Sequence, residues 1–116
     1  GGTVPFSEPE TAALRTFFLR EAPEMVLFWH SKADGVFIGS CGDFHQPSAD
    51  LAAIYGRASG YAVNDQFTAY PVSGDASDWL TTQNIPSFTV ELKTHSNTDW
   101  SLNLAGVLAI LEHYGR

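Results

Sequence analysis

The chain has 116 residues and a mass of 12.6 kDa, which fits one domain (1–116) with one core of ordinary size. Hydrophobic residues make up 44% of the sequence and charged residues 16%, a composition typical of folded globular proteins and not of disordered ones. The 6 basic and 13 acidic residues give a net charge of −7. This balance argues against nucleic acid or an anionic membrane as the partner, because both are bound by clustered Lys and Arg.

The first part of the chain predicts a helix followed by a strand. The capping-box pattern at 7–10, with Pro9 in the first turn, predicts a helix to about Arg20 with one buried apolar face. The apolar run at 25–29 predicts a strand in the middle of a sheet that is covered on both faces, with His30 at its carboxyl end.

The rest of the chain alternates between strands and helices. Short strands are expected at 36–38 and 61–63, with a loop from 39 and a helix that Ser48 caps and Gly60 ends between them. Residues 65–84 predict a long polar connection of the kind that forms functional loops or lids. A strand at 87–92 and an amphipathic helix at 100–114 follow.

This order of elements predicts an α/β domain, with a mixed β-sheet of about four strands and about three helices on its faces. A strand in the middle of a sheet needs a neighbour on each side, and about four strands are few for that arrangement. We therefore expect an unfinished sheet, whose missing neighbours come from elsewhere.

Two residues stand out as candidates for chemistry. His30 ends an apolar strand, where α/β sheets place their ligand crevices, although it also fits a core-edge histidine hydrogen-bonded to backbone. Glu91 shares one strand face with Thr89 and has apolar neighbours in sequence. A carboxylate there has either a partner or a pKa raised by burial, which suits a general base; a solvated edge-strand glutamate is the alternative.

Other polar and aromatic residues give weaker signals. Tyr70 lies on the long connection, where its side chain either swings over a ligand or packs the loop down. His95 follows Glu91 by four residues, roughly 13 Å along a strand at ~3.3 Å per residue, which is too far to share one metal ion. We interpret His45 and His113 as a loop and a helix-end histidine without a function.

Four motifs, in order and with suitable gaps, carry a resemblance to a known family. They are S-E-P-E-T at 7–11, H-S at 30–31, Y-x-x-S-G-x-x-x-D-W at 70–79 and F-T-x-E-L at 88–92. With them the chain resembles the zinc carboxypeptidases, metallopeptidases that include the pancreatic enzymes and the bacterial murein peptide amidases. The smaller bacterial branch is closer, and the resemblance covers nearly all of the chain.

The resemblance implies a zinc-dependent hydrolase that acts in proteolysis. It implies that His30 is a zinc ligand and that Glu91 is the base that deprotonates metal-bound water. Tyr70 would close over the substrate, and Ser31 would contact the substrate through its backbone. Ser77 matches a position that helps to set side-chain preference, but a small uncharged residue leaves that preference open.

Two of the family's zinc ligands have no counterpart here. They form an H-x-x-E motif, and no histidine of this chain has a glutamate three residues later. The family's substrate-binding arginines also belong upstream, so the chain resembles the carboxyl-terminal half of the enzyme. Because a catalytic zinc site needs three protein ligands, we expect zinc binding by this chain alone to be weak or absent, with little activity.

Three functions remain open at this point. The chain is part of a carboxypeptidase- or amidase-type hydrolase of peptides, as a fragment or as a split enzyme completed by an amino-terminal half. Alternatively, it is a non-catalytic remnant that self-associates, or an oligomeric hydrolase whose copies share His30, His45 or His95 in one metal site. In each case the truncated sheet exposes apolar surface, so we expect a homo-oligomer unless a complementing half covers it.

The compartment is open. Cys41 is the single cysteine, so the chain forms no internal disulfide, and both a reducing compartment and a secreted protein without disulfides fit. No apolar run approaches the ~20 residues that span a bilayer, and the first residues lack the basic start of a signal peptide. We expect a soluble protein without a membrane partner, and the cytoplasm is one compartment that fits.

Overall fold

The computed structural model describes residues 2–72 and 74–115, and these contain four helices and four strands. In chain order they are α1 (Pro9–Glu21), β1 (Val26–Ser31), β2 (Gly35–Ile38), α2 (Gln46–Ser59), β3 (Val63–Asn64), α3 (Ala76–Thr82), β4 (Ser87–Leu92) and α4 (Trp100–Tyr114). No helix in these residues is both long enough and apolar enough to cross a membrane. The expected α/β class is confirmed, with one helix more than expected, because α3 lies inside the segment predicted as a loop.

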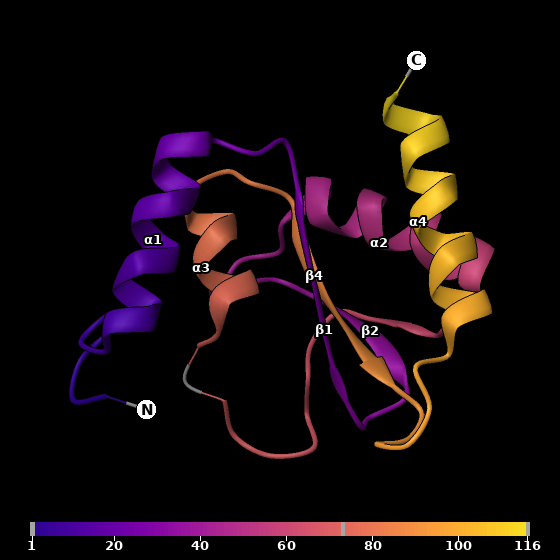
Figure 1. Cartoon of the computed structure of the whole chain (residues 1–116), viewed down its shortest axis with the longest axis horizontal. Helices are drawn as coiled ribbons and strands as arrows, with labels where there is room; N and C mark the ends of the chain where they lie inside the picture. The colour runs from indigo at the N-terminus through magenta and orange to yellow at the C-terminus, as the bar shows by residue number, and fades with distance from the viewer. Residues whose placement is uncertain (1, 73, 116) are drawn as a thin grey trace.

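The strands form one mixed sheet in the order β1–β4–β2–β3. β1 runs parallel to β4, β2 runs antiparallel to β4, and β3 runs parallel to β2. Helices α1 and α3 lie on one face of this sheet, and α2 and α4 lie on the other (Figure 1). The sheet is therefore covered by helices on both faces, as expected.

The main core lies between the sheet and the pair α2 and α4. Its centre is the ring of Tyr55 from α2, which packs against Phe88 of β4 with the ring centroids 5.1 Å apart. The buried core residues are Val36, Ile38, Leu51, Ala52, Tyr55, Tyr61, Phe88, Val90 and Ile110. Strands β2 and β4 supply four of these residues, so the two inner strands form the sheet side of the core.

Helix α2 begins three residues before the expected position. His45 is its N-cap, and the His45 side chain accepts a hydrogen bond from the backbone N–H of Ser48. The Ser48 side chain is buried instead, and its hydroxyl accepts a hydrogen bond from the N–H of Ser87 at the start of β4. The helix ends as predicted at Gly60, which has the left-handed φ of 80° that favours glycine.

Helix α1 departs from its prediction at the cap and along its apolar face. Glu8 is the N-cap residue but makes no side-chain cap, and the Ser7 hydroxyl bonds the Glu8 carboxylate instead. Within the helix only Phe18 is buried, while Leu14 and Phe17 remain about half exposed. The prediction of a buried helix face was wrong, because no other part of the described chain covers the outer side of α1.

Strand β1 lies at the edge of the sheet and not in its middle. Within the described residues it pairs with β4 alone, and Trp29 is 44% exposed. The central position belongs to β4, whose residues 87–90 are buried. An apolar run predicts that a strand is buried, but it does not identify the strand or the other chain that lies beside it.

Candidate active site

The register between β1 and β4 places His30 directly beside Glu91. His30 Nδ1 lies 3.7 Å from Glu91 Oε1, at the carboxyl ends of two adjacent parallel strands. The Glu91 side chain is 13% exposed and the His30 side chain 60% exposed. The carboxylate therefore sits in a largely dry position on an inner strand, and the imidazole lies at the outer edge with most of its surface free.

Both side chains project from the sheet face that α1 and α3 cover. Phe28, two residues before His30, packs against Phe18 of α1, with the ring centroids 6.5 Å apart. Thr89, two residues before Glu91, has its hydroxyl 3.4 Å from the buried hydroxyl of Ser77 in α3. Residues two apart on a strand share a face, so His30 and Glu91 lie on one side of the sheet.

Ser31 and His95 form a second contact near this end of the sheet. The Ser31 hydroxyl and His95 Nδ1 are hydrogen-bonded at 2.7 Å. Strand β4 ends at Leu92, and the turn after it brings His95 back toward β1. The estimate of roughly 13 Å from Glu91 assumed a continuing strand, so it does not apply here, and no sequence pattern signals this contact.

Tyr70 reaches the same sheet face through a row of aromatic rings. Phe37 of β2 is the register partner of Thr89, so its ring is on the face that carries Glu91. The rings of Phe37 and Phe67 lie 5.2 Å apart, and those of Phe67 and Tyr70 lie 4.7 Å apart, all edge to face. Tyr70 is 64% exposed. The loop is thus anchored by two phenylalanines that the motifs do not include.

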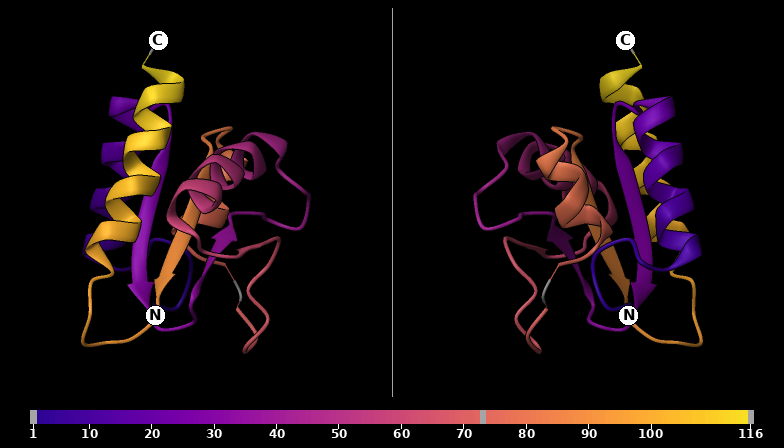
Figure 2. Two further views of the ribbon diagram at one scale, coloured as in Figure 1. Left: turned by 90° about the vertical axis from the view of Figure 1, so that its right-hand side faces the viewer. Right: turned by 90° about the vertical axis from the view of Figure 1, so that its left-hand side faces the viewer.

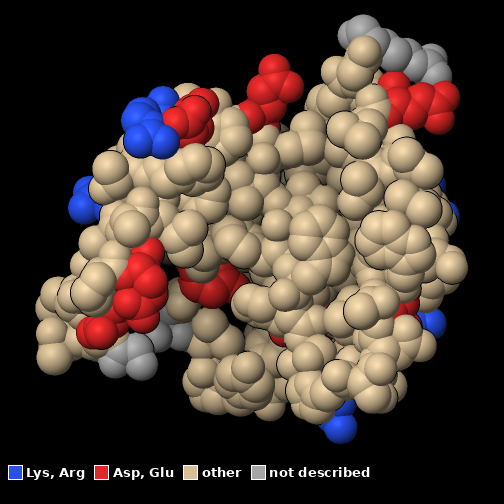
Figure 3. All heavy atoms as spheres, in the orientation of Figure 1, with Lys and Arg blue, Asp and Glu red and all other residues tan. Residues whose placement is uncertain are grey.

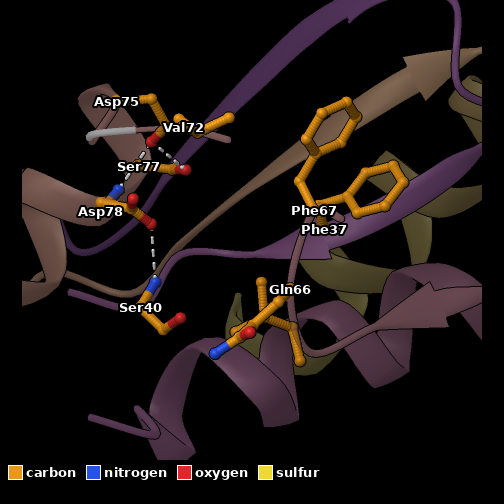
Figure 4. Close-up of a pocket in the computed structure, with 9 residues that line it drawn as sticks. Phe37, Ser40, Gln66, Phe67, Val72, Asp75, Ser77 and Asp78 are labelled. Carbon is orange, nitrogen blue, oxygen red and sulfur yellow. Dashed lines mark hydrogen bonds between the residues drawn. The ribbon is translucent and has the colours of Figure 1, made fainter. Parts of the chain in front are cut away.

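A hollow of about 220 Å³ opens between this loop and α3 (Figure 4). It is lined by Phe37, Ile38, Ser40, Gln66, Phe67, Val72, Asp75, Ser77 and Asp78. Aromatic and aliphatic side chains form part of its wall, and polar side chains form the rest. Ser77, predicted from the motif as a substrate-binding residue, is among the lining residues. Ser73, from the same motif, lies outside the described residues.

The polar wall of the hollow centres on two carboxylates to which the sequence motifs assign no role, although Asp78 is the aspartate of the D-W pair at 78–79. Asp75 caps α3 by accepting hydrogen bonds from the N–H of Asp78 at 2.8 Å and from the Ser77 hydroxyl at 2.7 Å. Asp78 accepts a hydrogen bond from the N–H of Ser40 at 2.9 Å (Figure 4). Burial and, to a lesser degree, the charge of Asp75 raise the pKa of Asp78, against the lowering effect of the Ser40 N–H. No basic residue is among those that line the hollow.

The described residues do not complete a metal site. They contain no group of three His, Cys, Asp or Glu side chains placed to hold one ion. A catalytic zinc ion needs three protein ligands, and His30 with Glu91 falls short of that number. His45 is engaged in the cap of α2, and the His113 ring packs on Tyr114, with the ring centroids 4.8 Å apart. The described residues alone therefore do not supply the ligands of a catalytic zinc ion.

No protein-family model and no curated protein sequence matches this chain. Solved structures do match. Murein-tripeptide amidase MpaA from Escherichia coli O157 superposes with a TM-score of 0.64 at 19% identity, covering 97% of this chain and 43% of the amidase chain. Thrombin activatable fibrinolysis inhibitor superposes with a TM-score of 0.78 at 22% identity, covering 97% of this chain and 35% of that chain.

These matches show that nearly the whole chain has a fold shared with part of both proteins. The fold expected from the zinc-carboxypeptidase motifs is thereby confirmed, including the similarity to a murein peptide amidase. The chain spans less than half of the length of either solved chain.

Proposed function

We propose that this chain carries part of the active site of a zinc-dependent carboxypeptidase- or amidase-type hydrolase that acts on peptides. The main support is the pairing of His30 with Glu91 at the carboxyl ends of β1 and β4, on the sheet face that also carries Tyr70 and the hollow. The fold shared with a murein-tripeptide amidase agrees with a hydrolytic role.

Glu91 is suited to move a proton in this reaction. Its carboxylate lies on an inner strand with little exposure, on the sheet face that α1 and α3 cover, and it is beside the exposed His30 imidazole. There it would accept a proton from the attacking water and return it to the leaving amine. Such a step explains why an acid is placed on an inner strand, where an unused carboxylate is costly.

His30 is the metal ligand that this chain offers. Zinc supplies polarisation of the scissile carbonyl and a water of lowered pKa in hydrolases of this class. The remaining ligands must come from another segment or from another chain, because the described residues supply too few. The exposed imidazole at the sheet edge is open to such a contribution.

The loop and the hollow would bind the substrate. Tyr70, exposed and in edge-to-face contact with Phe67, would close over the bound peptide and exclude water, and Ser31 would contact it through its backbone. The hollow that Ser77 lines would take a substrate side chain. Its two carboxylates repel an anionic side chain, so we expect neutral or cationic side chains to be preferred.

Zinc titration of the isotopically labelled chain tests the role of His30. Among the four histidines, the His30 ring signals are expected to respond first in NMR spectra, with weak affinity because one imidazole binds zinc poorly. His30→Ala should remove this response, and His113→Ala should leave it intact. A first response at another histidine would contradict the assignment.

Activity tests the role of Glu91 once the missing ligands are supplied by a second polypeptide that carries them. Glu91→Gln should reduce peptide hydrolysis by about 10²- to 10⁴-fold, the usual contribution of a general base. Glu24→Gln, in the exposed connection between α1 and β1, is the matched control. Equal activity of the two variants would exclude Glu91 as the base.

A second candidate is a non-catalytic remnant that self-associates, and the lack of a three-ligand group in the described residues favours it. A metal site shared between copies is a third candidate, and it would depend mainly on His30, since His95 is bonded to Ser31 and His45 caps α2. Elemental analysis of the purified chain separates them. The remnant holds no stoichiometric zinc, and the shared site holds at most one ion for two chains.

A further inference from the structure

One side of the molecule consists of α1, β1 and α4 (Figure 2). The two helices flank the strand, and all three elements expose large apolar side chains. These are Leu14, Phe17 and Leu19 of α1, Trp29 of β1, and Trp100, Leu104, Leu108, Leu111 and Tyr114 of α4. Scattered exposed apolar residues are normal, but this number on three adjacent elements is typical of an interaction surface.

The strand in this side offers an open edge. Within the described residues β1 pairs with β4 alone, so its other edge presents backbone N–H and C=O groups without strand partners. Monomeric proteins usually protect such an edge with Lys, Pro or a bulge. Residues 26–29 contain neither a charged residue nor a proline. The edge is therefore unprotected against pairing with another strand.

An apolar groove runs beside this edge. It has a volume of about 270 Å³ and lies between β1 and α4. Its lining residues are Met25, Leu27, Trp29, Val107, Ile110 and Leu111, and every one of them is apolar. A groove of this kind accepts apolar side chains from a partner that pairs with the strand beside it.

The charge distribution favours association of this side with an identical surface. α1 holds two acidic and two basic residues, β1 holds none, and α4 holds one acidic residue. These elements therefore carry −1 of the net charge of −7. In the space-filling view the surface over β1 and most of α4 is uncharged, with acidic and basic residues around it (Figure 3). Two acidic chains can meet here with little like-charge repulsion.

We infer that this side binds a second copy of the chain. The β1 strands of the two copies pair antiparallel about a two-fold axis, which continues the sheet from one copy into the other. The same axis places α4 against its counterpart on one sheet face and α1 against its counterpart on the other. Each element then contacts the same element of the second copy. Because this surface is apolar and nearly neutral, it is complementary to an identical surface. This inference does not depend on the proposed hydrolase function.

Sedimentation velocity over about 1–100 µM, the range in which specific protein pairs commonly associate, tests the inference. The wild-type chain is expected to sediment with about twice the 12.6 kDa mass. The double variant Leu108→Glu with Leu111→Glu, at positions 54% and 61% exposed, should be a folded monomer because four carboxylates would meet at the axis. Phe44→Glu, which adds a charge to the exposed loop before α2, should remain a dimer.

Hydrogen exchange gives a second measurement that does not rely on substitution. The amides of β1 should exchange more slowly as the concentration of the wild-type chain rises, while those of the 65–72 loop should not change. The inference would be overturned if the wild-type chain is monomeric by itself. It would also be overturned if the chain assembles only with a different polypeptide. A dimer that survives both α4 substitutions would overturn it as well. Association should persist when a chelator removes metal ions. A failure of the dimer inference can therefore be told apart from a failure of the proposed zinc-dependent function.

Discussion

Asp99 joins two segments that lie far apart in the sequence. Its Oδ2 accepts a hydrogen bond from the Tyr61 hydroxyl at 2.7 Å and another from the N–H of Lys93 at 3.0 Å. Burial, followed by the hydrogen bond and charge of Asp99, raises the pKa of Tyr61 above the ordinary value of 10.0. The Lys93 N–H and the Tyr61 hydroxyl lower the pKa of Asp99. The pair is therefore held as a neutral phenol and a carboxylate.

This pair predicts a loss of stability in alkali. Because the folded-state pKa of Tyr61 lies above its unfolded value, its contribution is complete below about pH 10 and is lost as the pH rises through the folded pKa. In urea titrations between about pH 8 and 11, Tyr61→Phe should lose less stability than the wild type. Tyr114→Phe, at the exposed end of α4, should follow the wild type. Equal slopes for all three proteins would contradict the assignment.

The same carboxylate gives a separate prediction in acid. Since the folded-state pKa of Asp99 is lowered, its contribution is present above the unfolded value of 3.8 and is lost as the pH falls through the folded pKa. Asp99→Asn should therefore flatten the stability profile below about pH 4, which thermal unfolding can measure. Asp34→Asn, in the turn between β1 and β2, is the control and should keep the wild-type profile.

At single residues, the sequence identified His30 and Glu91 because each has an unusual position in an apolar strand. It did not predict that the two side chains would be 3.7 Å apart, because that distance depends on the pairing of β1 with β4. The aromatic support of Tyr70 was missed for a related reason. Phe37 and Phe67 belong to different segments and meet through the fold alone.

At the scale of elements, the packing of α4 on α2 depends on Gly106. A Cβ atom at this position would lie 2.5 Å from Cε2 of the buried Tyr55 ring, closer than atoms can approach. Glycine inside a helix costs about 1 kcal/mol relative to alanine, so its presence here has a packing reason.

Gly106→Ala is therefore expected to destabilise the chain by about 1–3 kcal/mol, because the steric overlap outweighs the gain in helix propensity. Urea unfolding measures the change. Ser101→Ala, at an exposed position in the first turn of α4, is the control and should have little effect. A stabilised Gly106→Ala variant would show that α4 does not pack against the Tyr55 ring.

Elements with a complete local pattern were predicted well. The strand at 87–92 and the helix at 100–114 have the expected bounds. The alternation of residues in the strand and the spacing of apolar residues in the helix lie wholly within each segment, so the segment alone carries the information. Helix α3 was missed because seven residues in a polar connection are too few for such a pattern. The edge position of β1 was missed because its apolar composition carries no information about neighbours.

At the scale of the whole molecule, the inferred dimer predicts that thermal stability depends on concentration. If the apolar side is covered by a second copy only in the folded state, mass action stabilises the wild-type chain as its concentration rises. The melting temperature should increase over a hundredfold range of concentration. The Leu108→Glu and Leu111→Glu double variant should show one melting temperature throughout, and a wild-type value without this trend would contradict the prediction.

The pairing of β1 with β4 also has a consequence for synthesis on the ribosome. The Ser87 hydroxyl binds the Val26 carbonyl across 61 residues of sequence, and β1 has no other strand partner in the described chain. During translation the apolar β1 segment therefore emerges well before its partner, and it remains without a strand partner until β4 has been made. Closing so long a loop is slow, and chaperones that hold nascent apolar segments would act during this interval.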